Sequence, residues 1–252
     1  MANRNDLGGV WRTIGGRRVF IKDGQDLASA MKESGKFKTL NKKTEDLKTL
    51  NEQIKYIQNN QDKLYDIVEN SDNYDKELCV AFQERNGFNN KPTVLNSKDF
   101  DDLSDNDYIK VYRGYHDGQK SAEDYINQFK YGKNEYGNGG IAYGVGHYTI
   151  LDKKSANSYG TTIEIAIPKS ARIIEHDDLL KQHYRNFEEY NNNLEQYYNK
   201  YGDKVTTILD YMNSNESATA ILSNYDVVKQ NDMYIILNRG IISVKEGGKN
   251  EQ

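Results

Sequence analysis

The chain is poor in cysteine, in long apolar runs and in positive charge. Cys79 is the only cysteine among 252 residues, so an intrachain disulfide and a cysteine-based zinc site are excluded, and a reducing compartment is indicated. No run of about eighteen apolar residues is present to span a bilayer, and Met1–Asp6 has no signal-peptide core. A net charge of -4 gives no general attraction to nucleic acid or anionic membrane. We expect a soluble, intracellular protein that does not bind membranes.

The N-terminal segment predicts a β-hairpin followed by a helix. Two strand-prone runs, Val10–Ile14 and Arg17–Ile21, are joined by Gly15-Gly16, a pair that tolerates positive φ. Residues 25–37 have a helical pattern that stops at Gly35. Such a small unit is marginal on its own and should dock on something. The stretch resembles a segment of phage head-morphogenesis (minor capsid) proteins, so we interpret residues 1–37 as an attachment segment.

The hairpin is basic, with Arg12, Arg17, Arg18 and Lys22. These residues fit either a solvated strand face or an arm that binds nucleic acid. We favour the solvated face, because alternation along a hairpin places charged residues toward water.

The rest of the chain predicts helices first and strands later. Apolar residues recur on one helical stripe over residues 40–68, and a shorter helix is expected around Leu78–Phe82. The strand-like runs are Tyr108–Tyr112, Thr161–Ile167 and Met233–Leu237, with a long helical stretch over residues 178–201. We expect an α+β fold with a mostly antiparallel sheet, divided into the attachment segment 1–37, a helical region 38–94 and a catalytic domain 95–252.

Two tyrosines suggest a site for a flat, cationic ring. Tyr148 and Tyr159 stand eleven positions apart, behind a glycine-spaced run over residues 137–146. Aromatic faces stack on flat rings and attract positive charge, so the pair suits the nicotinamide of NAD. Arg113, at the end of a strand, offers a forked donor for phosphate or ribose oxygens. Gly114 allows a ligand to approach the backbone closely.

The order of these motifs resembles the ADP-ribosyltransferase family. The relevant runs are Tyr112-Arg113-Gly114, Gly144-Val-Gly-His-Tyr148-Thr149 and Lys154-Ser155-Ala-Asn-Ser-Tyr159. The second and third are similar to the diphtheria-toxin and poly(ADP-ribose) polymerase branch, whereas Arg113 is similar to the arginine-directed and clostridial toxin branch. The resemblance covers about Tyr108 to Val244 and implies a split, mostly antiparallel sheet with NAD as the substrate.

The resemblance implies a role for each matching residue. Arg113 would contact NAD, with Thr149 supporting it. The backbone of Gly114 would hold the nicotinamide amide, with Ser155 bonding the same amide. Tyr148 and Tyr159 would sandwich the ring. The expected reaction transfers ADP-ribose to an unknown protein or nucleic-acid acceptor and releases nicotinamide.

The chain departs from the family at the third motif, where active members carry a glutamate at the start of a late strand. Here the strand reads Asn231-Asp232-Met233-Tyr234. In one register, Asp232 takes the position of this glutamate and is the catalytic carboxylate, with a shorter side chain. In the other register, Met233 takes that position and Asp232 points to the opposite face of the sheet. Glu164 and Glu216 are alternative carboxylates.

The remaining expectations concern metals, partners and location. We expect no metal, because the histidines lack metal-ligand spacing, and we expect Asp177 or Asp178 to cap a helix. The resemblances imply a toxin-like transferase of the host cytoplasm, or one associated with the virion through phage head proteins. An alternative is a degenerate transferase fold that serves as a head component or binding module. Another is nucleic-acid binding through the hairpin, which the net charge disfavours.

Overall fold

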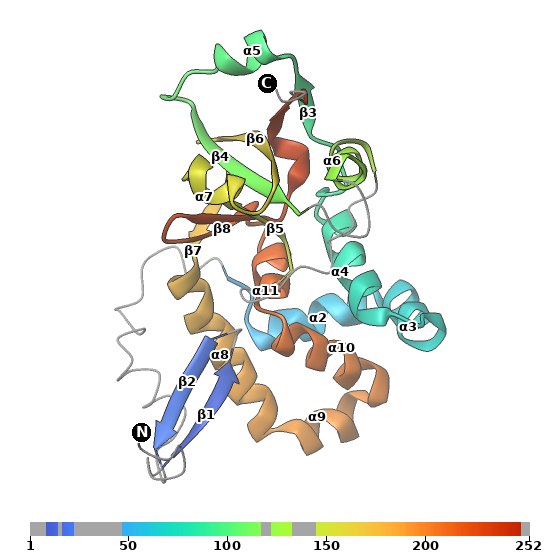
Figure 1. Ribbon diagram of the computed structural model, residues 1–252. Helices are drawn as coiled ribbons and strands as arrows, with labels where there is room; N and C mark the ends of the chain where they lie inside the picture. The colour runs from blue at the N-terminus through green and yellow to red at the C-terminus, as the bar shows by residue number, and fades with distance from the viewer. Residues whose placement is uncertain (1–8, 15–16, 23–46, 117–121, 133–144, 248–252) are drawn as a thin grey trace.

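The computed structural model describes residues 9–14, 17–22, 47–116, 122–132 and 145–247. Figure 1 shows a sheet at one end of the molecule, a layer of helices beneath it, and a separate two-stranded hairpin near the N-terminus. The predicted α+β class is confirmed. The predicted helix at residues 25–37 and the glycine-spaced run before Val145 lie outside the described residues.

The predicted N-terminal hairpin is confirmed. β1 (Gly9–Ile14) pairs antiparallel with β2 (Arg17–Lys22), and Trp11 takes the register position opposite Phe20.

The main sheet has eight strands in the order β3-β10-β6-β4-β5-β9-β8-β7. Five neighbouring pairs are antiparallel, and the two end pairs, β3 with β10 and β7 with β8, are parallel. The strands are β3 (Thr93–Leu95), β4 (Tyr108–Tyr115), β5 (His147–Ile150), β6 (Thr161–Pro168), β7 (Ile173–Glu175), β8 (Val227–Gln230), β9 (Met233–Ile236) and β10 (Ser243–Lys245). The three predicted strands correspond to β4, β6 and β9, so alternation identified the strands with the largest apolar content.

Two of the predicted helical stretches are each divided in two. The stripe over residues 40–68 forms two described helices separated by Asn60, whose side chain bonds the carbonyl of Tyr56. The stretch over residues 178–201 is interrupted at Asn193. The helices are α2 (Leu50–Asn59), α3 (Gln61–Asn70), α4 (Tyr74–Arg85), α5 (Ser97–Asp101), α6 (Ala122–Tyr131), α7 (Lys153–Asn157), α8 (His176–Asn192), α9 (Leu194–Tyr201), α10 (Asp203–Ser214) and α11 (Glu216–Leu222), with a 3-10 turn η2 (Arg239–Ile241).

The predicted capping by Asp177 or Asp178 is wrong. α8 begins before both of them, at His176, and its N-cap is Glu175, for which no side-chain cap bond is seen among the described residues. Asp178 instead accepts a 2.7 Å hydrogen bond from Lys181 within the helix. Both residues lie in the first turn, where a carboxylate still favours the helix dipole.

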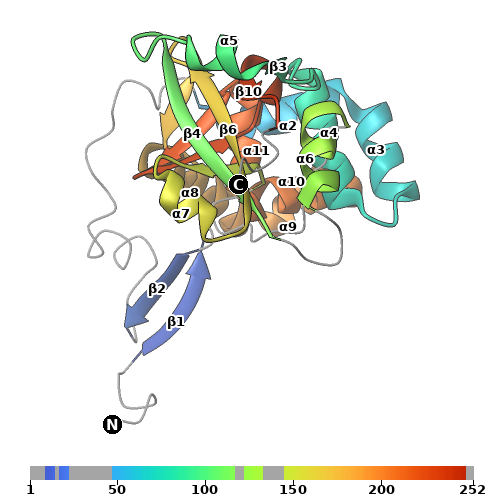
Figure 2. The ribbon, with the colours of Figure 1, turned by 45° about the horizontal axis from the view of Figure 1, so that its top comes forward.

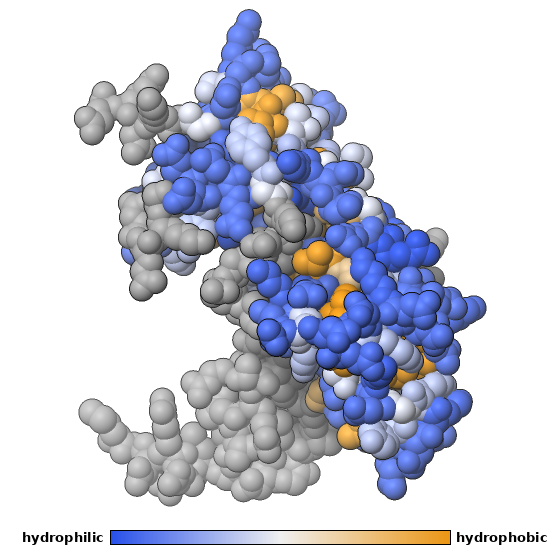
Figure 3. All heavy atoms as spheres, turned by 90° about the vertical axis from the view of Figure 1, so that its right-hand side faces the viewer, coloured by the Kyte–Doolittle hydropathy of each residue, from blue (hydrophilic) through white to orange (hydrophobic). Residues whose placement is uncertain are grey.

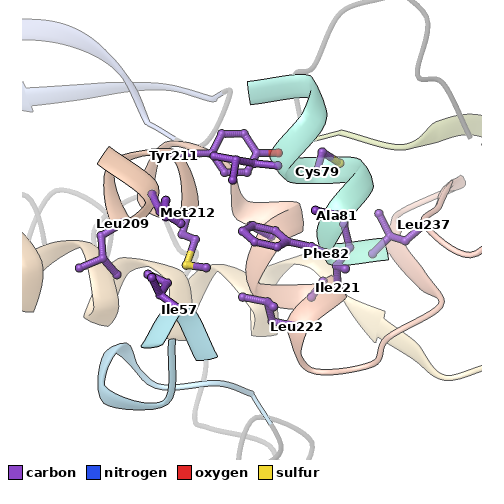
Figure 4. Close-up of a cluster of buried hydrophobic side chains, with 14 of the residues drawn as sticks. Ile57, Cys79, Ala81, Phe82, Leu209, Tyr211, Met212, Ile221, Leu222 and Leu237 are labelled. Atoms are coloured by element: carbon purple, nitrogen blue, oxygen red, sulfur yellow. The ribbon is translucent and has the colours of Figure 1, made fainter. Parts of the chain in front are cut away.

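A large core joins the helices to one face of the sheet. Ile57, Phe82, Met212 and Ile221 come from α2, α4, α10 and α11 and pack together (Figure 4), and Val228 and Ile235 bring β8 and β9 into the same cluster. The helices before residue 95 therefore share a core with the helices after residue 202. No helix among the described residues is long and apolar enough to cross a membrane.

A second core lies on the opposite face of the sheet. It gathers Val111, Ile165, Ile236 and Val244 from four strands, and α6 covers it with Ala122 and Phe129. We call this side, which carries Arg113 and His147, the α6 face. The side that carries Gly114 and Tyr148 is the α7 face, because α7 packs on it next to Gly114.

Candidate functional site

The candidate site lies where β4 and β5 separate. These two strands share a single ladder pair, Tyr112 with Ile150. By contrast, β4 pairs with β6 over its whole length, and β5 pairs with β9 over its whole length. Arg113 and Gly114 follow the last shared pair on β4, and Thr149 and Tyr148 precede it on β5. The matching motifs of the sequence therefore flank one junction in the sheet.

On the α7 face, the structure brings Gly114 and Tyr159 together. A Cβ atom at Gly114 would lie 2.1 Å from the carbonyl oxygen of Ala156 and 2.8 Å from Cβ of Tyr159. Only a residue without a side chain allows α7 and the following turn to approach β4 this closely. Gly160, with φ +118°, makes the turn after Tyr159 possible. Tyr159 is thus in the turn after α7, and its side chain is exposed.

Tyr148 projects from β5 on the same face. It is partly buried against the large core, beside Ile235, its ladder partner on β9. Tyr159 is 65% exposed. One ring is therefore anchored by packing and the other is accessible to a ligand, and both lie on the face on which α7 packs against Gly114.

Ser155 is engaged at the start of α7. Its hydroxyl and its backbone N–H both donate to the side chain of Asp152, the N-cap of α7. These bonds hold the pKa of Asp152 below its usual value. The hydroxyl proton of Ser155 therefore serves the helix cap, which leaves only its oxygen lone pairs for another partner.

Arg113 points to the α6 face, away from the two tyrosines. Its guanidinium lies over the ring of Tyr115 at 5.1 Å, and its buried Nη1 atom has no hydrogen-bond partner among the described residues. The hydroxyl of Tyr115 is likewise buried without a partner. A buried donor that makes no hydrogen bond costs about 1–3 kcal/mol. This cost would be recovered if an acceptor entered beside Arg113.

His147 lies near two arginines, Arg113 and Arg239. Burial, then the charges of Arg113 and Arg239, hold the pKa of His147 well below its usual value, so the imidazole is neutral. Its ring meets the edge of Phe129 at 4.7 Å. Arg239 donates to the carbonyl oxygens of Gln128, Phe129 and Gly132 at the end of α6. Arg239 thereby fixes α6 against the sheet.

Thr149 bonds the neighbouring strand. Its hydroxyl donates a 2.7 Å hydrogen bond to the carbonyl oxygen of Tyr234 on β9. Thr149 thus lies on the same face as Arg113 but strengthens the β5–β9 pairing.

Asp232 lies in the two-residue turn that joins β8 to β9. Asn231 has φ 54° and Gln230 pairs with Met233, so Asp232 precedes the strand and is exposed. Its carbonyl oxygen accepts a hydrogen bond from the N–H of Leu151. Met233 is opposite Ile150, two residues from Tyr148 on β5, and so shares the α7 face with Tyr148. Of the two registers open to the sequence, the structure has the one in which Met233 faces the tyrosine side.

The two alternative carboxylates are both engaged with basic side chains, and only Glu164 lies near the junction, as the ladder partner of Tyr112. Glu164 bonds Lys153 at the N-terminal end of α7 at 2.9 Å, and Lys245 is 3.7 Å away. Glu216 is buried in the helical layer, 2.6 Å from Nε2 of His176. Glu216 is thus remote from the junction, whereas Glu164 lies beside it on the α7 face and is paired with Lys153.

Sequence reasoning missed Arg239 and Tyr115. Arg239 follows β9 by three residues and Tyr115 ends β4, and neither belongs to a recognisable motif. Their only signal is position at the end of a strand. Among the described residues, no group of three histidine, cysteine or acidic side chains is arranged to hold a metal ion.

Comparisons of the chain with protein-family models, with curated proteins and with solved structures found no match. The chemistry of the junction is therefore the basis for a functional proposal.

Proposed function

We propose that this protein binds NAD at the β4–β5 junction and transfers ADP-ribose to a macromolecular acceptor, with release of nicotinamide. The observation that carries the proposal is that Tyr148 on β5 and Tyr159, which packs beside Gly114 of β4, lie on the same face of the sheet at the point where the two strands separate. A nicotinamide ring between the two tyrosines would stack on both, and stacking of aromatic rings contributes about 0.5–1.5 kcal/mol beyond area burial.

The reaction depends more on the correct placement of NAD and the acceptor than on acid or base catalysis. The bond between the ribose carbon and the pyridinium nitrogen breaks, and its electron pair leaves with neutral nicotinamide. A nucleophilic atom of the acceptor attacks the cationic ribose carbon and loses its proton. The proposed donors for the ribose or diphosphate oxygens are the buried Nη1 of Arg113 and the hydroxyl of Tyr115; both lie on the α6 face, so the dinucleotide must pass between β4 and β5 beyond their shared pair to reach them. Asp232 is the proposed carboxylate for the ribose cation.

One observation favours a second candidate, a protein that binds NAD with little turnover. Met233 shares the face of Tyr148, and a thioether supplies no negative charge to stabilise a ribose cation. The transferase-like fold would then act as a binding module, for example within a phage head as the N-terminal resemblance implies.

Nicotinamide release from NAD, measured with and without host-cell lysate, tests the proposal. We expect Tyr159→Ala to lower release at least tenfold without unfolding the protein, because this ring is exposed. Tyr198→Ala is the matched control, since Tyr198 is a 52% exposed tyrosine on α9. Equal effects of the two substitutions would overturn the proposal.

A second pair of variants separates the two candidates. If the protein is a transferase that uses Asp232, Asp232→Asn abolishes release while calorimetry still detects NAD binding. If the protein only binds NAD, the unmodified chain binds NAD saturably, releases no nicotinamide, and loses binding in Arg113→Ala. Absence of binding by the unmodified chain would reject both.

A further inference from the structure

The helix α7 depends on few contacts for its position. Figures 1 and 2 both show it beside β4. Ala156 is its buried residue, and its other side chains are exposed or partly exposed. Asp152 caps its N-terminal end, and the close approach of Ala156 to Gly114 places it against β4. A helix of five residues is not stable by itself. Each contact with the sheet therefore helps to fix the turn that carries Tyr159.

Lys153 occupies a position of α7 at which a cation is unfavourable. It is the first residue of the helix, directly after the N-cap Asp152. The positive end of the helix dipole lies there, so a carboxylate is favoured at this position and an ammonium group is not. A residue that opposes the local preference usually serves a contact made elsewhere in the fold. For Lys153, that contact is with the sheet.

Lys153 joins α7 to β6 and to β4. Its Nζ atom lies 2.9 Å from Oε1 of Glu164 on β6 and 5.6 Å from the centre of the Tyr112 ring on β4. Glu164 and Tyr112 are ladder partners, so both contacts are made on the α7 face. The side chain of Glu164 is 24% exposed. A partly buried ion pair is screened by salt less than a pair on the open surface.

Glu164 extends this connection toward the edge of the sheet. The same Oε1 atom lies 3.7 Å from Nζ of Lys245 on β10. Lys245 in turn pairs with Asp101 of α5 at 2.8 Å. One carboxylate oxygen therefore serves a lysine of α7 and a lysine of β10, and the second lysine helps to hold it in place for the first.

We propose that Lys153 and Glu164 are positioning residues of the NAD site. Their ion pair fixes α7 on the sheet and thereby fixes Tyr159 relative to Tyr148 on β5. The inference rests on the proposed function, because it concerns the affinity of that site for NAD. Neither residue takes part in the cleavage of NAD. Loss of the pair therefore weakens NAD binding and leaves the rate of nicotinamide release at saturating NAD unchanged.

Calorimetry with NAD tests the proposal on the full chain. Lys153→Met and, separately, Glu164→Gln remove one charge and keep the approximate size of the side chain. Each raises the Kd for NAD about threefold, as expected for a partly exposed ion pair. Lys153→Glu raises it about tenfold, because repulsion replaces attraction, although the new carboxylate suits the start of the helix. Lys153→Arg keeps the charge and restores the affinity of the unmodified chain.

Two other lysines provide matched controls. Lys229 forms a 2.9 Å ion pair with Glu175 between β8 and β7, at the other end of the sheet. Lys63 forms a 2.8 Å ion pair with Glu84 between α3 and α4, on the side of the molecule that Figure 3 shows, where hydrophilic residues predominate. Lys229→Met and Lys63→Met each remove an ion pair of the same length and leave the Kd for NAD unchanged.

Hydrogen exchange without NAD separates this inference from the proposed function. Lys153→Met and Glu164→Gln speed the exchange of the amides of Ala156 and Tyr159, whose hydrogen bonds close α7 and its turn. The two control variants do not. If the unmodified chain binds no NAD, the proposed function fails, while faster exchange in these variants still supports the role of the pair in placing α7.

Two results would overturn the inference. The first is an unchanged Kd or an unchanged exchange rate in both Lys153→Met and Glu164→Gln. The second is a lower rate of nicotinamide release at saturating NAD in Glu164→Gln, since Glu164 would then act in the reaction itself.

Discussion

Two buried polar clusters of this protein differ in how their charges are balanced. In the helical layer, His176 and His183 on α8 lie with Glu216 of α11, and the 2.6 Å contact between His176 and Glu216 joins a base to an acid. On the α6 face of the sheet, His147 lies near Arg113 and Arg239, and the charges that act on it are both positive. The first cluster contains an acid that is hydrogen-bonded to one of its histidines. In the second, Nη1 of Arg113 has no acceptor within the part of the chain that the structure describes, and a ligand that brings negative charge would supply one.

The largest expected effect is on the helical cluster. Glu216→Ala removes the acid from a pair in which both side chains are at most 1% exposed. Loss of a buried hydrogen bond that leaves one group unsatisfied costs about 1–3 kcal/mol, and the cavity left by the side chain adds to this cost, so we expect a loss of about 3 kcal/mol in the free energy of unfolding measured in urea. Glu195→Ala, at an exposed site on α9, is the control and changes stability by less than about 0.5 kcal/mol. A loss below about 1 kcal/mol for Glu216→Ala would show that the cluster does not support the fold.

Acidification acts on the same cluster. Burial, followed by the charge of His176, lowers the pKa of His183 from 6.5 to about 4. The unfolded chain takes up this proton near pH 6.5, while the folded chain takes it up only near pH 4. Stability is therefore lost as the pH falls through this window, by about 3 kcal/mol in all.

The measurement is urea unfolding at several pH values. His183→Gln should flatten the curve between pH 6.5 and 4, although His147, whose pKa is also lowered, keeps part of the slope. An unchanged slope in His183→Gln would assign the acid sensitivity to other groups.

A smaller effect is expected at the junction. Gly114→Ala places a Cβ atom 2.1 Å from the carbonyl oxygen of Ala156, so α7 and Tyr159 must move away from β4. Overpacking of this kind costs about 1–3 kcal/mol, and we expect NAD binding to fall more steeply than stability. Gly247→Ala, where the nearest heavy atom is 3.8 Å away, is the matched control. Calorimetry with NAD and thermal unfolding of both variants separate the two effects.

The smallest change in stability is expected for Arg113→Met. This substitution keeps the packing over Tyr115 but removes a charge that acts on His147. At pH 7 the free energy of unfolding should change by no more than about 1 kcal/mol, because the substitution also removes a buried donor without a partner. NAD affinity should fall at least tenfold. A loss of stability as large as that of Glu216→Ala would make Arg113 a structural residue like Glu216.

Local sequence pattern predicted part of this architecture. The patterns of β4, β6 and β9 and of the two hairpin strands are local, and all five strands are present. The interruptions at Asn60 and Asn193 were missed because the apolar residues continue past each break with helical spacing. Local turn geometry, not periodicity, divides these helices.

The site was predictable to a smaller extent. Alternation along a strand implies that Arg113 and Gly114 face opposite sides, but the place where β4 and β5 separate depends on pairing between distant segments. The register of Asp232 and Met233 stayed open because it depends on how many residues the turn at Asn231 uses. The burial of His183 and the attachment of Arg239 to α6 are consequences of tertiary packing and have no local signal.

The single ladder pair between Tyr112 and Ile150 has a mechanical consequence. The strands belong to one sheet. However, β4 is paired along its whole length with β6, β5 is paired along its whole length with β9, and a single residue pair joins β4 to β5. We expect the sheet to bend most easily at this pair. A molecule that contacts both Arg113 on β4 and Tyr148 on β5 would form a second connection between the two strands. It would slow the exchange of backbone amide hydrogens along the edges of β4 and β5, although it would contact few of these amides directly.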